Sequence, residues 1–268
     1  MSAATLSIDS GLLKGVWRAG ELAAVAGRTL DTGYPLLNSA LPGGGWPVGA
    51  MTELLQRRPG CGEWGLLAPA LASLHAAAGP PAAVTLIGAP HQPFGPALIA
   101  RHVEPLGWLR VQTQTPTERL WSAEQALRCA AVSVVLLWLP RVEASHLRRL
   151  HLAAQTHGTL LFVFRPESAQ NESSPAPLRL HLSWLSAQQG RAAPALQVQL
   201  LKRRGPPLAH ALTLETATPR LQSLLLASRV QSALRRQAST PVQPRHEPHD
   251  QLRVKDRSHA VDRLASTA

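Results

Sequence analysis

The segment 132–139 (VSVVLLWL) is apolar on both of its alternating faces, so a strand formed there must be covered by protein on each side. The segments before and after it, 117–130 and 145–158, carry apolar residues at helical spacing. Further strand-like segments (50–55, 82–87, 109–113 and 159–164) alternate with helix-like ones (66–78 and 96–102). Alternation of this kind predicts an α/β fold, with a mostly parallel sheet and helices on both of its faces.

The second half of the chain departs from this alternation. The segments 178–185 and 195–204 alternate polar and apolar residues, which predicts an antiparallel extension at the sheet edge. Residues 166–177 are polar and contain prolines, so we expect a surface loop there. Ser145 and Gly158 are the expected caps of the helix that they bound. We therefore expect four parts: an N-terminal helical segment (1–28), the α/β core (29–215), a C-terminal helix (216–238) and a disordered tail (239–268).

The charge of the chain permits contact with nucleic acid or with an acidic partner and does not choose between them. The formal net charge is +11, from 27 Lys and Arg against 16 Asp and Glu. These charges are spread along the sequence, and aromatic residues are not interleaved with the basic ones as they are in base-stacking surfaces. We expect DNA binding that is at most weak, salt-sensitive and independent of sequence.

Cysteines and apolar runs set further bounds. Cys61 and Cys129 lie in no CxxC pair and near no ligand-spaced histidine, so we expect reduced thiols and no metal site. No apolar run reaches the roughly 18 residues that span a bilayer, and the first thirty residues lack the pattern of a signal peptide. We expect a cytoplasmic protein without a membrane partner.

Two stretches carry a resemblance to a known family. The segment 29–55 (TLDTGYPLLNSALPGGGWPVGAMTELL) resembles the start of the RecA ATPase core, and 84–140 follows the RecA order of strands and helices. A closer match is to the ImuA family, through PGGGWPVGAMTELL, WSAEQALR, LLWLP and FRP. This resemblance implies a RecA-like core over 29–215. It also implies a role in SOS-induced translesion DNA synthesis, a mutagenic form of DNA repair. The implied partners are an inactive Y-family polymerase homologue (ImuB), an error-prone replicative-type polymerase and RecA.

The loop that should bind phosphate lacks the residues for it. A P-loop, GxxxxGK[ST], curls backbone N–H groups around phosphate, while its lysine neutralises charge and its hydroxyl holds magnesium. Here RRPGCGEWG follows the strand, with Arg57 at the first glycine, Gly60 in the turn, and Gly62, Glu63 and Trp64 in place of Gly-Lys-Ser/Thr. Glu63 would face a triphosphate with a repelling charge.

Two other groups of an ATPase are also missing. Trp138 ends the strand that we expect beside the loop strand, where an acid would order magnesium, and Pro90 stands where a glutamate would activate water. A misalignment of one or two residues is the alternative for each position alone, but 134–139 contains no acid at any offset. We expect a pseudo-ATPase with no catalytic residue, no cofactor and no metal.

Two segments are candidates for partner contacts. The resemblance implies that the basic strand end, Lys202, Arg203 and Arg204, approaches a neighbouring subunit, although a solvated basic corner is an equal alternative. In the helix 219–237 the candidate contacts are an apolar stripe and terminal arginines: Leu221, Leu224, Leu225, Arg235 and Arg236. The alternative is that the helix packs back on the sheet, above all with its first half.

Two other functions stay open. VVLLWL at 134–139 and FRPESA at 164–169 also resemble SulA, which would imply a cell-division inhibitor that binds FtsZ. A nucleotide-binding, recombinase-like ATPase with an unorthodox phosphate loop is the other alternative.

Overall fold

The protein is described by a computed structural model, which covers residues 27–60, 62–77, 83–185 and 193–238. The expected N-terminal helix within 1–28, the tail 239–268 and Cys61 lie outside these described residues. Contacts divide the chain into one unit that runs to Ser228 and a second that begins at Arg229. None of the helices in the described ranges is long and apolar enough to cross a membrane.

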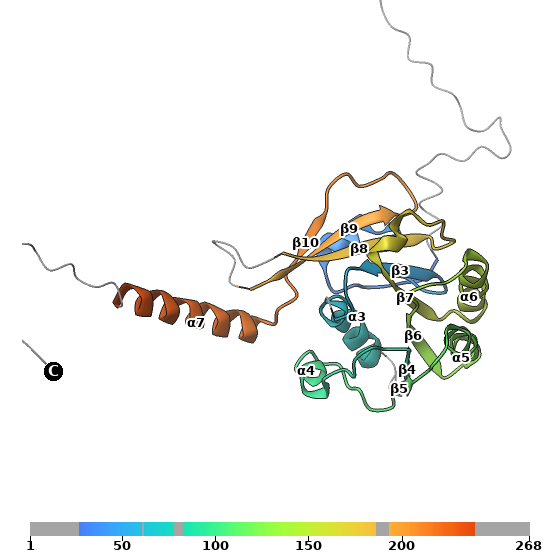
Figure 1. The fold of residues 1–268 in the computed structure, drawn as a ribbon, viewed down its shortest axis with the longest axis horizontal. Helices are drawn as coiled ribbons and strands as arrows, with labels where there is room; N and C mark the ends of the chain where they lie inside the picture. Colours follow the sequence, from blue (N-terminus) through green and yellow to red (C-terminus); the bar gives the residue numbers. More distant parts are fainter. Residues whose placement is uncertain (1–26, 61, 78–82, 186–192, 239–268) are drawn as a thin grey trace, which may run out of the picture. The chain divides into compact units, whose positions relative to one another are not determined.

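Strands and helices alternate through the first unit (Figure 1). The strands are β1 (Thr29–Leu30), β2 (Trp46–Pro47), β3 (Met51–Gln56), β4 (Ala83–Ile87), β5 (Leu109–Val111), β6 (Val132–Trp138), β7 (Leu160–Pro166), β8 (Leu178–Leu185), β9 (Ala195–Lys202) and β10 (Leu212–Leu214). The helices are α2 (Pro35–Ala40), α3 (Glu63–Ala77), α4 (Gly95–Ile99), α5 (Pro116–Arg128), α6 (Ala144–His157) and α7 (Pro219–Ala238), with 3-10 turns η1 (Pro42–Gly44) and η2 (Glu167–Asn171).

One eight-stranded sheet organises the core, in the order β10-β9-β8-β3-β7-β6-β4-β5, and β1 and β2 form a separate small sheet. All pairs from β8 to β5 are parallel, which confirms the predicted mostly parallel α/β fold. The antiparallel extension is confirmed only in part. Strand β8 pairs parallel with β3, so the reversal begins at β9, and β10 continues it.

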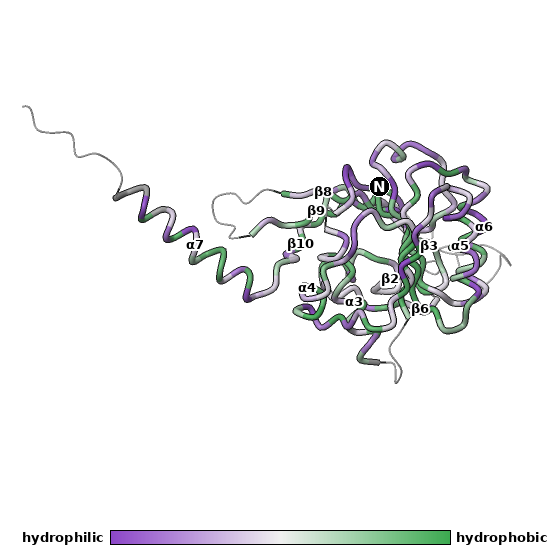
Figure 2. Tube along the Cα trace, turned by 60° about the horizontal axis from the view of Figure 1, so that its bottom comes forward, coloured by the Kyte–Doolittle hydropathy of each residue, from purple (hydrophilic) through white to green (hydrophobic). Residues whose placement is uncertain are grey.

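Helices cover both faces of the sheet. Val134, Leu136 and Trp138 of β6 pack with α3, while Val135, Leu137 and Leu139 pack with α5 and α6. Figure 1 accordingly draws α3 on one side of the strands and α5 and α6 on the other. In Figure 2 the central strands β3 and β6 are hydrophobic between helices with hydrophilic stretches. The two buried faces explain why 132–139 has no polar alternation.

Local signals at two helices can be compared directly with the structure. Gly158 ends α6 in the left-handed conformation, with φ 65°, as expected. Ser145 was the wrong cap, because Glu143 occupies that position and α6 has no side-chain cap there. Helix α5 begins with a full capping box between Thr115 and Glu118, whose reciprocal bonds fix its start. The predicted loop 166–177 contains the 3-10 turn η2.

A buried ion network joins the three central strands to η2. Glu53 of β3 is fully buried, and its carboxylate accepts bonds from Arg179 Nε at 2.6 Å and Arg165 Nη1 at 3.4 Å. Arg165 also reaches Glu172 at 2.6 Å, and Arg179 donates to the carbonyls of Ala169 and Gln170 at 2.9 and 3.2 Å. The network therefore ties β3, β7 and β8 to the segment that contains η2.

Replacing Glu53 by Gln should lower the free energy of unfolding by about 3–5 kcal/mol, because two buried guanidinium groups lose their shared counter-charge. Urea denaturation followed by circular dichroism measures this loss. The matched control is Arg149→Gln, which breaks the pair between the exposed Arg149 and the half-buried Glu124 and should cost about 1 kcal/mol. A loss for Glu53→Gln as small as that of the control would contradict a structural role for the network.

Candidate pseudo-nucleotide site

The loop between β3 and α3 occupies the position of a phosphate-binding loop, at the carboxyl end of a central parallel strand and at a helix N-terminus. Glu63, the first residue of α3, is only 3% exposed. Its Oε1 accepts bonds from the backbone N–H of Gly60 at 2.7 Å and from Gln56 Nε2 at 2.8 Å. A carboxylate of the chain itself thus takes a loop N–H group of the kind that binds phosphate in a P-loop.

This orientation differs from the sequence expectation, in which Glu63 would face an incoming triphosphate. The side chain turns inward instead, and its Oε2 is buried without a hydrogen-bond partner among the described residues. A negative charge in the first turn of α3 is favourable there, because the N-terminus of a helix carries partial positive charge. The Glu63 carboxylate therefore takes the place at this helix N-terminus that a bound anion would occupy.

The neighbouring loop residues Gly62 and Trp64 pack against other parts of the fold. Gly62 has φ +99°, which favours glycine, and a Cβ at this position would lie 2.8 Å from Leu196 Cδ1, so a larger residue would also have to displace that leucine side chain. Trp64 is half-buried and stacks on Trp108, with ring centroids 5.7 Å apart. Gly60 also has a positive φ of +83° and lies in the exposed turn.

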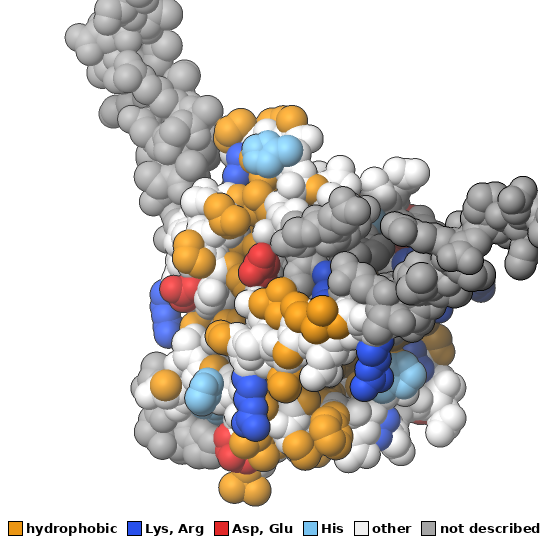
Figure 3. Space-filling view, turned by 90° about the vertical axis from the view of Figure 1, so that its left-hand side faces the viewer, with side chains coloured by type: hydrophobic (Ala, Val, Ile, Leu, Met, Phe, Trp, Pro, Cys, Tyr) orange, Lys and Arg blue, Asp and Glu red, His pale blue; other side chains and the backbone are white. Residues whose placement is uncertain are grey.

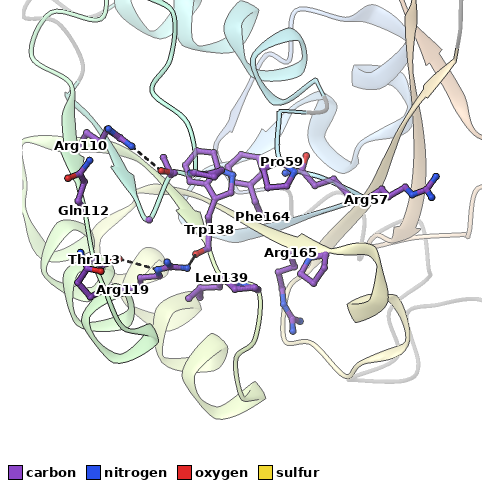
Figure 4. Close-up of a pocket in the computed structure, with 17 residues that line it drawn as sticks. Arg57, Pro59, Arg110, Gln112, Thr113, Arg119, Trp138, Leu139, Phe164 and Arg165 are labelled. Atoms are coloured by element: carbon purple, nitrogen blue, oxygen red, sulfur yellow. Dashed lines mark hydrogen bonds between the residues drawn. The ribbon is translucent and has the colours of Figure 1, made fainter.

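Three of the predicted positions come together in a pocket of about 520 Å³ at the carboxyl ends of the parallel strands (Figure 4). Arg57 follows β3, Pro90 follows β4 and Trp138 ends β6, and all three line it. Gly60, Gly62, Glu63 and Trp64 do not line it. The structure thus splits the predicted site into a closed loop and an open pocket beside it.

The expected place of Trp138 in the sheet was wrong by one strand. Strand β6 does not lie beside the loop strand, because β7 pairs with β3 on one edge and with β6 on the other. Trp138 instead stacks on Phe164 of β7, with ring centroids 4.4 Å apart. These two rings form an apolar wall where a magnesium-ordering acid was sought.

Arginines that the sequence reading missed also line the pocket. Arg119 donates from Nε to Thr113 Oγ1 at 3.1 Å and from Nη1 to the carbonyl of Trp138 at 3.4 Å. Arg110 donates to the carbonyl of Ala89 at 3.2 Å, a bond that Figure 4 draws with those of Arg119. Arg110 lies within β5 and Arg119 near the start of α5, on either side of the carboxyl end of β5. The usable signal was this position, since open α/β sheets bind ligands at the carboxyl ends of their strands.

Acidic groups are missing from this pocket as far as it is described. Its described lining contains no Asp or Glu, and Arg165, which also lines it, is paired with Glu53 and Glu172 behind it. Within the described ranges no group of three or more His, Cys, Asp or Glu is placed to hold a metal ion. The pocket offers guanidinium, amide and aromatic groups, which suit an anion better than a cation.

The basic strand end, hereafter the basic edge, lies at the amino ends of the parallel strands, opposite the pocket. Lys202 pairs in register with Arg179 near the start of β8, whereas the pocket lies at the carboxyl ends of the parallel strands. Lys202 donates to the carbonyl of Ser174 at 2.9 Å, and Arg203 donates to the carbonyls of Pro206 and Ala40. Lys202 and Arg204 are exposed, and Arg203 is half-buried. Because the cluster lies beside the start of β8, the structure does not bring it to the pseudo-nucleotide site.

His151 of α6 lies near this basic edge. Its Nδ1 accepts a bond from the backbone N–H of Met51 at 3.2 Å. Burial, and then the positive charges of Arg204 and Lys202, lower the pKa of His151. The neutral ring that results keeps Nδ1 free to accept this bond. Arg28, His151 and Arg204 line a second pocket of about 360 Å³.

The apolar residues of α7 are largely open to solvent. Leu224 is 60% exposed and Leu221 44%, while Leu225 is half-buried. The alternative that the first half of α7 packs back on the sheet is therefore not what the structure shows for these side chains. Arg235 is exposed, and the side chain of Arg236 lies outside the described part.

A scan of the chain against models of known protein families finds no match, and a search of curated proteins finds no relative.

Replacing Glu63 by Ala should lower the free energy of unfolding by about 1–3 kcal/mol, because the N–H of Gly60 and the amide of Gln56 lose their buried acceptor. Thermal and urea unfolding measure the change. Glu104→Ala, at an exposed carboxylate, is the matched control and should stay within about 0.5 kcal/mol of wild type. If Glu63→Ala proves as stable as this control, the carboxylate does not hold the loop.

Proposed function

We propose that the chain is a non-catalytic accessory protein of the ImuA type, which uses a RecA-like body to dock proteins of SOS-induced translesion DNA synthesis. The observation that carries the proposal is Glu63, whose buried carboxylate bonds to the loop N–H of Gly60. A fold that keeps the sheet but closes its phosphate loop with its own anion is better suited to binding proteins than to hydrolysing a nucleotide.

The pocket beside the loop supports the same reading. Trp138 and Pro90 line this pocket at the ends of their strands, and its described lining offers no carboxylate. An ATPase needs such acids to hold the metal and position the attacking water. We infer that the recombinase-like ATPase is the weaker alternative.

The SulA-type alternative rests on the segments 134–139 and 164–169, and the structure gives both another use. Residues 134–139 are buried in the sheet. Arg165 is buried against Glu53, and Ala169, a buried residue of η2, accepts a bond from Arg179 through its carbonyl. Arg165 and Ala169 belong to the buried ion network, so their role in stabilising the fold accounts for the sequence shared with SulA at these positions. They do not form an exposed surface that favours FtsZ binding.

Exposed surfaces for partners remain at two places. Lys202 and Arg204 are exposed at the basic edge, and α7 presents Leu221, Leu224 and Leu226 with no acidic residue in the helix. Figure 3, which looks at the side where Figure 1 draws α3 and α4, shows hydrophobic side chains broken up by basic and polar ones. We assign α7 to the polymerase homologue and the basic edge to RecA.

Ending the chain after Thr218 should weaken binding of the Y-family polymerase homologue by at least about tenfold, because several exposed leucines of α7 are removed. This end point keeps Thr216, which is buried against Gly65. Surface plasmon resonance with the purified homologue measures the change.

The matched control is Lys202→Ala with Arg204→Ala in the full chain. This pair leaves Arg203 and its bonds to Ala40 and Pro206 intact. It should weaken RecA binding and spare the polymerase homologue. A folded chain ending at Thr218 that binds the homologue as tightly as wild type would refute the assignment of α7.

A further inference from the structure

We propose that the pocket lined by Arg57, Arg110 and Arg119 binds an acidic peptide segment of a protein partner, with carboxylates at the arginines and an apolar side chain against the Trp138–Phe164 wall. The inference deepens the proposed docking function and rests on it, because it names the chemistry of the partner that this pocket accepts.

The arginines of the pocket carry positive charge that no described carboxylate balances. Arg57 is exposed, and none of Arg57, Arg110 and Arg119 forms an ion pair with a carboxylate in the part of the chain that the structure describes. The described lining adds no acid to balance them. Guanidinium groups present paired N–H donors that match the two oxygens of a carboxylate. A ligand with several carboxylates is complementary to this rim.

Several side-chain atoms around the pocket have no hydrogen-bond partner among the described residues. Four residues that line it each have one such buried atom: the donors Arg110 Nε, Trp138 Nε1 and Arg165 Nε, and the acceptor Gln56 Oε1. Trp138 and Arg165 are 7% and 3% exposed, so these N–H groups gain little from bulk water. Buried polar atoms normally have partners. A peptide offers both kinds of partner to side chains that turn toward the pocket, because carboxylates accept and a backbone N–H donates.

The shape of the aromatic wall favours a peptide over nucleic acid. A base-stacking site needs an open ring face, but Trp138 and Phe164 stack on one another and are nearly buried. The proline-bearing rim, which includes Pro59, Pro90 and Pro140, adds apolar surface around them. The volume of about 520 Å³ accommodates one apolar side chain with its flanking acids.

Isothermal titration calorimetry of the full chain with the peptide acetyl-Asp-Phe-Asp-Leu-Glu-amide tests the proposal. We expect saturable binding that weakens as salt rises, since the rim arginines are partly exposed. Arg110→Gln with Arg119→Gln should weaken binding by about tenfold or more. Arg57→Gln should also weaken it, and this exposed side chain can change without loss of a described hydrogen bond. The controls are Arg128→Gln with Arg148→Gln, at exposed arginines outside the pocket, and the peptide with its acids replaced by amides.

The proposal is overturned if the wild-type chain does not bind the peptide at millimolar concentration, or if Arg57→Gln binds it as well as wild type. It is also overturned if a 5′-phosphorylated single-stranded oligonucleotide binds through Arg57 and Arg110 while the peptide does not. The truncation after Thr218 tests whether α7 binds the polymerase homologue, and the peptide titration tests whether the pocket binds acidic peptides. Either proposal can therefore fail while the other holds.

Discussion

Glu53 is the charge around which the centre of the fold is arranged. It lies fully buried on β3, the strand that carries the phosphate-loop position, and holds Arg165 of β7 and Arg179 of β8. Two guanidinium groups in a covered sheet require such an anion, since burying an unpaired charge is strongly unfavourable. The same contacts anchor η2 and set Arg165 at the edge of the pocket, so the site beside β3 depends on this network.

A second carboxylate governs what the site can do. Glu63 accepts bonds from Gly60 and Gln56, which leaves the loop already neutralised at the helix N-terminus. An incoming phosphate would have to displace this carboxylate and leave it buried without those donors, at a cost of a few kcal/mol. The mostly parallel sheet and the closed loop therefore coexist, and the open arginine-lined pocket beside the loop is what remains for binding.

Much of the fold followed from local pattern. The doubly buried strand at 132–138, the helices α5 and α6 and the glycine that ends α6 were all predicted, because each depends on residues near in sequence. Strand order was not predictable in this way. The place of β7 between β3 and β6 depends on contacts between strands that are far apart in the sequence. Strand β10 has only three residues, which is too short for an alternating pattern of polar and apolar residues to be recognised.

The candidate site was predicted less completely, for a related reason. Arg57, Pro90 and Trp138 were placed by their order along the chain, and the pocket does contain them. Arg110 and Arg119 were missed, because a three-residue strand, β5, and the start of α5 bring them to the pocket. The inward turn of Glu63 depends on Gln56 across the loop, which spacing alone does not reveal.

The most direct test of the central claim is a calorimetric titration of the purified full-length chain with ATP and magnesium, with RecA as the positive control. A loop closed by Glu63 predicts no binding heat up to millimolar nucleotide, and no protection of the chain against thermal unfolding at that concentration. Saturable micromolar binding that shifts the melting temperature upward would contradict the account, because it would show that phosphate still displaces the carboxylate.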